Sequence, residues 1–130
     1  MNICIIDDEK DNREILTFII SCYHKDVSIV GEADSVKSGI KIINDTKPDL
    51  IFLDIEMPDG TGFDLIRQLS VCKPEVIFCT AYNQFALKAI ECSALDYVLK
   101  PIIKDSIANA FQKANKKLDD NNKVLQYEIL

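Results

Sequence analysis

Residues 51–60 read IFLDIEMPDG, and this stretch decides how the rest of the chain is interpreted. An uninterrupted apolar run ends abruptly at the acid Asp54, and a second acid, Glu56, follows two positions later. A run of this kind is typical of a short strand that is covered on both faces. An acid at the tip of such a strand indicates either a surface loop or a site that needs a rigidly held carboxylate.

Four other short apolar runs resemble the one that precedes Asp54. Ile, Val, Phe and Tyr dominate them, and they are continuous rather than alternating, which is typical of parallel strands. The predicted strands span residues 2–6, 27–33, 49–53, 75–79 and 96–99. The second carries Glu32 near its end, which favours a position at the edge of the sheet.

Amphipathic patterns typical of helices follow each of these strands. The predicted helices span residues 11–22, 35–46, 61–71, 83–92 and 104–118, with Ser35 and Asn83 as expected N-caps. The apolar residues expected on their buried faces are Ile15, Phe18, Ile19, Cys22, Val36, Ile40, Ile43, Phe63, Ile66, Leu69, Phe85, Leu87, Ile90, Ile107, Phe111, Ala114 and Leu118. The alternation predicts a flavodoxin-like, doubly wound α/β domain: five helices around a five-stranded parallel sheet in the order 2-1-3-4-5.

Hydrophilic residues follow four of the five predicted strands. They are Asp7 and Asp8 after the first, Asp54 after the third, Thr80 after the fourth and Lys100 after the fifth. Because ligands of doubly wound sheets bind beyond the carboxyl ends of the strands, we expect these side chains to share one crevice. Each signal alone is commonplace in a turn or at the start of a helix, but four at matching strand ends indicate a site.

The predicted crevice combines three carboxylates with an ammonium and a hydroxyl. Carboxylates that crowd together repel one another, and a hard divalent cation such as Mg²⁺ relieves that repulsion with oxygen ligands and waters. Lys100 adds a compact positive charge. A carboxylate nucleophile beside a metal and an ammonium suits phosphoryl transfer, because the cations neutralise the oxygens of the transferred group. The residues therefore predict phosphoryl-transfer chemistry centred on Asp54.

Composition narrows the classes of partner. The formal net charge of −6 argues against nucleic-acid binding by this chain and gives no support for an anionic membrane surface as partner. No apolar run approaches the roughly 20 residues that span a membrane. The first residues show no signal-peptide pattern, so we expect a cytoplasmic protein.

The cysteines and the single histidine predict no metal site of their own. The five cysteines are Cys4, Cys22, Cys72, Cys79 and Cys92, and none of them forms a CxxC pair. Their odd number and apolar surroundings predict buried, reduced thiols. His24 has no cysteine nearby at zinc-ligand spacing, and we expect it at the surface.

Four motifs occur in the order of a known family: IIDDE (5–9), LDIEMPDGTGFDLI (53–66), FCTAY (78–82) and LDYVLKPI (95–102). Together they resemble the receiver domain of a two-component response regulator, over residues 1–118. The resemblance implies that Asp54 accepts a phosphoryl group from a phosphohistidine of a sensor histidine kinase. It also implies that the domain promotes only its own phosphorylation and dephosphorylation, and is not an enzyme towards other substrates.

The resemblance assigns roles to the other residues of the crevice. Asp7, Asp8 and Asp54 would hold Mg²⁺ together with the backbone carbonyl of Glu56. Lys100 would pair with the phosphoryl oxygens.

Further roles concern how the signal is relayed and how long it lasts. Thr80 would move towards the phosphoryl group and Tyr97 would swing inward behind it, so that these two form the switch. Glu56 and Tyr82 would flank the path of the hydrolytic water and set the lifetime of the phosphoryl group. Family members usually have a cis peptide bond before the proline that corresponds to Pro101.

The local sequence, including TAYNQFALKAIECSALDYVLKPI (80–102), resembles receivers of the LytR/AlgR-like subgroup, which carry LytTR-type DNA-binding domains. The polar run DDNN (119–122) predicts that the last helix ends there, and that residues 119–130 form a linker or the start of an extension towards an output domain. A stand-alone receiver that acts through protein contacts is the alternative. The resemblance also implies homodimerisation through the face formed by the fourth helix, fifth strand and fifth helix.

Two other functions compete with a receiver. A phosphatase of the haloacid-dehalogenase type also uses an Asp nucleophile, but its motif resembles Asp-x-Asp, whereas Glu56 occupies the second position here. A flavin- or nucleotide-binding domain shares the predicted fold. However, the sequence contains no G-x-G-x-x-G or Walker A motif, and carboxylates without a metal would repel phosphates.

Overall fold

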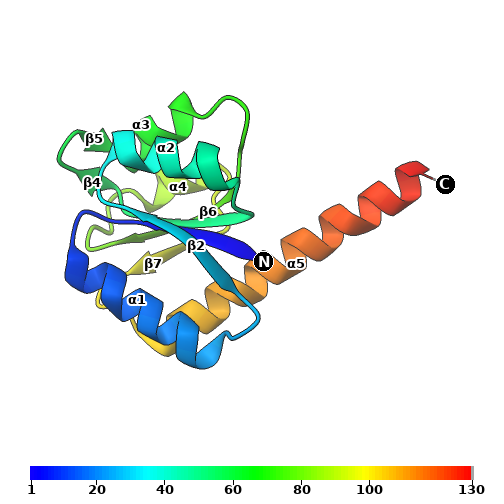
Figure 1. Ribbon diagram of the computed structural model, residues 1–130, viewed down its shortest axis with the longest axis horizontal. Helices are drawn as coiled ribbons and strands as arrows, with labels where there is room; N and C mark the ends of the chain where they lie inside the picture. Colours follow the sequence, from blue (N-terminus) through cyan, green and yellow to red (C-terminus); the bar gives the residue numbers. More distant parts are fainter. Residues whose placement is uncertain (130) are drawn as a thin grey trace.

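The computed structural model describes the backbone of residues 1–129 and the side chains of residues 1–123, and it shows a sheet between two layers of helices (Figure 1). The sheet has the strand order β2-β1-β3-β6-β7, and every neighbouring pair is parallel. The strands are β1 (Asn2–Ile6), β2 (Ser28–Ala33), β3 (Leu50–Leu53), β6 (Glu75–Thr80) and β7 (Asp96–Leu99). The predicted order 2-1-3-4-5 and the edge position of the second strand are confirmed, because β6 and β7 are the fourth and fifth strands of this sheet.

Five helices flank the sheet, as predicted. They are α1 (Lys10–Tyr23), α2 (Val36–Thr46), α3 (Gly62–Gln68), α4 (Ala86–Glu91) and α5 (Lys104–Ile129). Helix α1 and the first turns of α5 cover one face, whereas α2, α3 and α4 cover the other (Figure 1). In β1, Ile3 and Ile5 pack on the face covered by α1 and α5, and Cys4 and Ile6 pack on the face covered by α2, α3 and α4. Residues 3–6 of the strand are therefore all apolar and buried, whereas Asn2 at its start is exposed, and this explains the lack of alternation.

Helix α2 begins where the sequence predicts, and it is doubly capped. The Ser35 hydroxyl accepts from the Ser38 N–H at 3.0 Å, and the Ser38 hydroxyl lies 3.1 Å from the Ser35 N–H, which completes a capping box. Asp59, from a distant loop, accepts from the N–H groups of Lys37 and Val36 at 3.0 and 2.8 Å. These bonds hold the pKa of Asp59 below its usual range.

The buried face of α1 differs from the predicted one. Leu16, Ile19 and Ile20 are buried, whereas Ile15 is 45% exposed and Phe18 is 67% exposed. Residues 15–23 contain two overlapping apolar stripes of helical spacing. Periodicity alone does not choose between adjacent stripes, and packing against the sheet and α5 selects the one rotated by one residue.

Helix α4 is shorter than predicted, and it buries little. It begins at Ala86 after the N-cap residue Phe85, so the prediction of Asn83 as the cap was wrong. Leu87 and Ile90, expected in the core, are 70% and 71% exposed, and Ala89 is the buried residue of this helix. The small alanine faces the sheet, and the two large side chains point outward.

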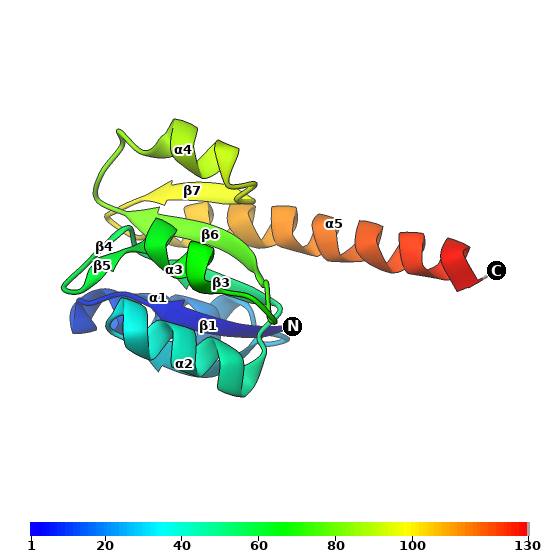
Figure 2. The ribbon, with the colours of Figure 1, turned by 90° about the horizontal axis from the view of Figure 1, so that it is seen from above.

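The prediction that the last helix ends near residue 118 was wrong. Helix α5 continues through the DDNN run to Ile129, and Figure 2 shows its last turns extending past the sheet. Residues 102–129 contain no Gly or Pro, and Asp and Asn cost a helix less than about 1 kcal/mol each, so the polar run ends the amphipathic stripe but not the helix. None of the described helices is both long and apolar enough to cross a membrane.

Two predictions about surface exposure also needed correction. All five thiols are free, but Cys22 and Cys92 are exposed rather than buried. His24 is half-buried rather than at the surface, because its ring packs on Phe111 of α5 with 4.4 Å between the ring centroids. Apolar neighbours in the sequence therefore do not guarantee that a thiol is buried.

A short hairpin that the sequence did not predict follows the central strand. It consists of β4 (Glu56–Met57) and β5 (Gly60–Thr61), which pair antiparallel. Gly60 has φ +151°, a conformation that other residues rarely adopt. A Cβ on Gly62 would lie 2.5 Å from the carbonyl oxygen of Asp54. The two glycines thus let the hairpin fold back closely over the end of β3.

Candidate functional site

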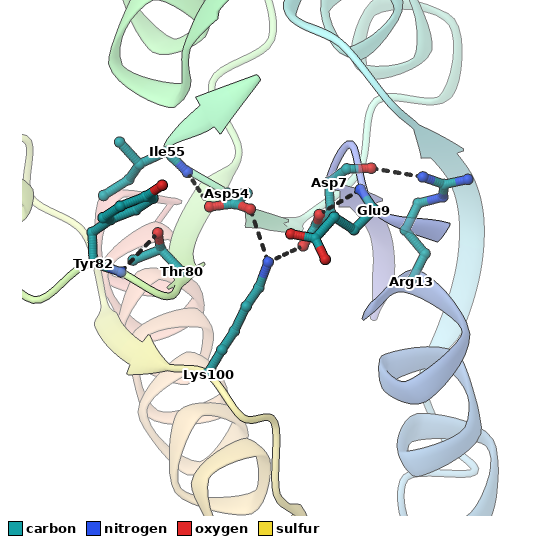
Figure 3. Close-up of polar contacts among 8 residues, drawn as sticks. All are labelled: Asp7, Glu9, Arg13, Asp54, Ile55, Thr80, Tyr82 and Lys100. Atoms are coloured by element: carbon teal, nitrogen blue, oxygen red, sulfur yellow. Dashed lines mark hydrogen bonds and ion pairs between the residues drawn. The ribbon is translucent and has the colours of Figure 1, made fainter. Parts of the chain in front are cut away.

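The structure brings the predicted polar residues together at the carboxyl edge of the sheet. Asp7 and Asp54 follow β1 and β3, Thr80 ends β6, and Lys100 follows β7 (Figure 3). Asp7, Asp54 and Thr80 are the buried polar residues within the part of the chain whose side chains are described. Parallel strands end at the same edge, so adjacent strands deliver these groups to one place.

Lys100 links the two buried acids. Its Nζ lies 2.8 Å from Oδ2 of Asp7 and 2.8 Å from Oδ2 of Asp54, and its side chain is only 10% exposed. Burial by itself lowers the pKa of this lysine, but the hydrogen bonds and charges of Asp54 and Asp7 outweigh it and raise the pKa well above the usual range. Lys100 is therefore a fixed positive charge at any physiological pH.

Asp54 is held from several directions. Its N–H donates to the Ile6 carbonyl at 2.9 Å, and its Oδ1 accepts from the Ile55 N–H at 2.7 Å. Its other carboxylate oxygen bonds to Lys100. The residue is 6% exposed. The buried run behind Asp54 therefore presents its carboxylate in one orientation.

A third carboxylate completes an acidic cluster. Asp7, Asp8 and Asp54 offer oxygen atoms within 4.8 Å of one another, and Asp8 is the exposed member. Burial raises the pKa of Asp7, and the nearby Asp54 adds to this, whereas the hydrogen bonds from Lys100 and the Glu9 N–H act against it.

The donor set fits a divalent cation. It consists of oxygen atoms at an open edge, as Mg²⁺ prefers, and leaves room for waters. Three carboxylates against the one ammonium of Lys100 also leave the cluster negative. The predicted fourth ligand, the backbone carbonyl of Glu56, belongs to β4, and its part in a metal site stays a prediction.

Thr80, Tyr82 and Tyr97 form a connected series. Thr80 is fully buried, and its Oγ1 lies 3.4 Å from the Tyr82 N–H that donates to it. The Tyr97 hydroxyl donates to the Tyr82 carbonyl. Burial raises the pKa of Tyr97, although a backbone hydrogen bond opposes this. The two predicted switch residues are thus joined through the backbone of Tyr82.

Glu56 and Tyr82 lie beside each other near the acids. The Glu56 carboxylate, as hydrogen-bond acceptor and as negative charge, raises the pKa of the exposed Tyr82 phenol. Figure 3 shows the Tyr82 side chain on the Ile55 side of Asp54. The structure brings these two residues together, while their effect on a phosphoryl lifetime stays a prediction.

Two further features concern neighbours of the site. The peptide bond between Lys100 and Pro101 is cis, as expected from the family resemblance. Cys79 lies directly before Thr80, and burial raises the pKa of its thiol to about 12. A thiol with such a pKa stays protonated, so Cys79 is not a competing nucleophile.

Sequence reasoning missed one residue that contacts this cluster. Arg13 on α1 donates from Nη1 to the Asp7 carbonyl at 2.8 Å (Figure 3). No sequence motif identified Arg13, because the sequence marks it by nothing more than its position about one helical turn after the acids. Only the fold shows that its side chain turns back towards β1.

The comparison with protein families decides which of the competing functions applies. The model of the response regulator receiver domain matches residues 3–112. The chain belongs to this family. The receiver therefore works in two-component signalling, and the predicted flavodoxin-like fold is confirmed.

The receiver is also similar to named proteins of bacteria. It is 44% identical to sensory transduction protein LytT of Enterococcus faecalis, over 91% of this chain and 49% of that protein. It is 38% identical to LytT of Bacillus anthracis, over 90% of this chain and 48% of that protein. These relatives agree with the predicted subgroup, and the receiver spans about half of their length.

Solved structures show the same architecture. The response regulatory domain of protein mrkE from Klebsiella pneumoniae has a TM-score of 0.81 and 33% identity, and the match covers 92% of this chain and 99% of that one. The REC domain of AraT from Geobacillus stearothermophilus has a TM-score of 0.83 and 26% identity, covering 93% and 97%.

Proposed function

We propose that this receiver is a phosphorylation-activated switch in which Asp54 accepts a phosphoryl group from the phosphohistidine of a sensor histidine kinase. The observation that carries the proposal is the single ammonium of Lys100, 2.8 Å from both Asp54 and Asp7 in a crevice with a third carboxylate. The crevice provides a fixed nucleophile beside a fixed cation, which phosphoryl transfer requires because it depends on positioning and charge.

The transfer exchanges one bond for another. An Asp54 carboxylate oxygen forms a bond to phosphorus while the P–N bond to the kinase's histidine breaks, and the electron pair of that bond stays on the imidazole nitrogen. Asp54 is already held by the Ile55 N–H and Lys100, so little reorganisation precedes the attack. Lys100 then pairs with the oxygens of the transferred group.

Asp7, Asp8, Asp54 and the Glu56 carbonyl would hold Mg²⁺. When bound, the ion supplies positive charge to the equatorial oxygens of the phosphoryl group. Lys100 shares that task from the side of β7. The buried Asp7 fixes one edge of the cluster, whereas the exposed Asp8 leaves the other edge open to water and to the incoming group.

Thr80 and Tyr97 would convert the new charge into a change of shape. A phosphoryl oxygen on Asp54 would offer the Thr80 O–H a charged acceptor, and movement of Thr80 towards it would break the long 3.4 Å bond in which Oγ1 accepts from the Tyr82 N–H. Moving Thr80 would release the backbone of Tyr82, whose carbonyl accepts from Tyr97. The segment between β6 and α4 would then adjust, and Tyr97 would settle inward behind Thr80.

Glu56 and Tyr82 would set how long the phosphoryl group lasts. The Glu56 carboxylate lies next to the Tyr82 phenol. The Tyr82 side chain lies on the Ile55 side of Asp54, where a hydrolytic water would approach (Figure 3). A carboxylate can orient such a water, and an aromatic ring can block it. The balance between the two determines the lifetime.

The signal would leave through an output domain beyond this chain. Residues 1–118 would act as the receiver, and residues 119–130 would lead towards a DNA-binding domain that controls transcription in the cytoplasm. The length of the LytT relatives, about twice the matched region, supports this. Exposed Leu87 and Ile90 on α4 and Leu99 on β7 support a homodimer through the face made by α4, β7 and α5.

The proposal is tested by incubating the chain with acetyl phosphate and Mg²⁺ and measuring its intact mass. We expect one phosphoryl adduct, which does not form when the metal is chelated before acetyl phosphate is added. Absence of the adduct under labelling conditions contradicts the proposal. Rapid turnover of a generic phosphomonoester would favour the phosphatase instead.

A further inference from the structure

Asp7 is fixed by hydrogen bonds on every side. Its N–H donates to the Ala33 carbonyl of β2 at 3.0 Å. Its Oδ1 accepts from the Glu9 N–H at 2.9 Å, and its Oδ2 pairs with Lys100 at 2.8 Å. Its carbonyl accepts from Nη1 of Arg13 at 2.8 Å (Figure 3). Of these partners, Arg13 is the charged side chain that has no place in the phosphoryl-transfer chemistry.

The side chain of Arg13 is held in place rather than free in solvent. It is 19% exposed, and its Nε lies 3.7 Å from Oε1 of Glu32 on the edge strand β2. Its other arm reaches the end of β1. The guanidinium thus ties the carboxyl ends of two neighbouring strands to α1, since a planar fork donates in two directions at once.

The bond from Arg13 acts on the peptide group between Asp7 and Asp8. A donor on the Asp7 carbonyl fixes the plane of that peptide group, and the plane sets the direction in which Asp8 leaves the backbone. Within residues 1–123, the Asp8 carboxylate makes no hydrogen bond or ion pair. The position of the exposed Asp8 carboxylate relative to Asp7 and Asp54 is therefore set mainly by the backbone.

We infer that Arg13 is a positioning residue for the divalent-cation site, and that it acts through the Asp7 carbonyl to orient the carboxylate of Asp8. The inference rests on the proposed Mg²⁺ site. Without Arg13, the Asp7–Asp8 peptide group loses its outer restraint, so cation binding has to order it. That ordering weakens binding.

The charge of Arg13 predicts the opposite effect. A cation near the cluster repels Mg²⁺, so removing it through Arg13→Ala would tighten binding if charge were its whole contribution. Loss of positioning weakens binding instead. The sign of the change therefore separates the two roles, and Lys10 provides the matched control.

Lys10 begins α1 and lines the same surface groove as Arg13. It pairs with Glu14 at 3.7 Å, and it makes no bond to Asp7. The substitution Lys10→Ala removes one positive charge from the groove and leaves the Asp7 carbonyl untouched. It reports the charge effect alone.

The experiment is a Mg²⁺ titration of the unphosphorylated chain, followed by amide shifts in ¹H–¹⁵N spectra, for the native protein, Arg13→Ala, Arg13→Lys and Lys10→Ala. We expect Arg13→Ala to raise the Kd for Mg²⁺ about tenfold. Arg13→Lys should lie between, because an ammonium keeps the charge but donates from one point. Lys10→Ala should bind as tightly as the native chain or more tightly. Before Mg²⁺ is added, the Asp8 amide should shift most in Arg13→Ala, less in Arg13→Lys and least in Lys10→Ala.

A Kd for Arg13→Ala that is equal to or lower than that of Lys10→Ala overturns the inference. If Arg13→Ala shows no cooperative unfolding transition, Arg13→Lys decides, and native affinity in that variant also overturns it. A native chain that binds no Mg²⁺ contradicts the proposed function itself. That failure is distinct, because it appears before any substitution is made.

Discussion

Helices α2 and α4 cover the same face of the sheet, but they are anchored very differently. Helix α2 has 11 residues, a capping box and the additional Asp59 cap, and it buries Val36, Gly39 and Ile43. Helix α4 has six residues, no side-chain cap, and Ala89 as its buried residue. A helix with few buried contacts and no side-chain cap moves at a lower cost in free energy.

The difference matters because the site spans both regions. The acids lie at the ends of β1 and β3, near the firmly anchored α2. Thr80 lies at the end of β6, and the segment that leads from it into α4 contains Tyr82 and the N-cap residue Phe85. We infer that charge is received on the rigid side of the molecule and that the movement occurs on the side of α4.

The largest expected effect tests the anchoring directly. Ile43 of α2 is fully buried, so Ile43→Ala should lower the free energy of unfolding by about 2–5 kcal/mol. Ile90 of α4 is 71% exposed, so Ile90→Ala should change it by less than about 0.5 kcal/mol. Urea denaturation measures both values, and similar losses in the two variants would remove the contrast.

An intermediate effect tests whether Thr80 connects the two regions. Thr80→Ala should leave phosphorylation of Asp54 largely intact, because the hydroxyl is placed to sense charge rather than to attack. It should reduce the shifts that phosphorylation causes in the NMR signals of Tyr97 and of α4. Intact mass reports the first quantity and amide spectra the second. Native-sized shifts at Tyr97 would show that the switch does not pass through Thr80.

The smallest effect concerns the rigid side alone. Burial raises the pKa of Asp7, so between the ordinary aspartate pKa and the raised one the native state binds more protons than the unfolded state. Stability therefore falls as pH rises through that window, and the loss is complete above the raised pKa. Asp7→Asn should raise Tm by a few degrees at pH 7 without Mg²⁺ and remove this slope.

Asp8→Asn is the control for that prediction, because Asp8 is exposed and should change Tm less. With Mg²⁺ present, the gain of Asp7→Asn should shrink, since the native chain alone keeps the full set of carboxylates. A lower Tm for Asp7→Asn without metal would contradict the cause assigned to the pKa shift.

The sequence was sufficient for the sheet and for the acids. Strands buried on both faces need continuous apolar runs, so the sequence shows where each strand ends. The polar residues of the site come directly after these ends, and Asp54 and Lys100 could therefore be located by position. The N-cap Ser35 could also be predicted, because its capping bonds involve residues within one stretch of four.

Other features depend on tertiary packing and could not be predicted from the sequence. The sequence of α1 allows two apolar stripes, and the neighbouring helix α5 selects between them. Ile90 and Leu87 look like core residues, but α4 turns them outward. Arg13 and Asp59 act on backbone groups of other elements, and only the folded chain brings those groups within reach.

The central claim is that Asp54 is the residue that accepts the phosphoryl group. Borohydride reduces an aspartyl phosphate to homoserine, so the chain is phosphorylated with acetyl phosphate and Mg²⁺, reduced, digested and mapped by peptide mass spectrometry. We predict homoserine at position 54 in the native chain and none in Asp54→Asn. Homoserine at Asp7 or Asp8 in the native chain, or an unchanged phosphoryl adduct in Asp54→Asn, would contradict the account.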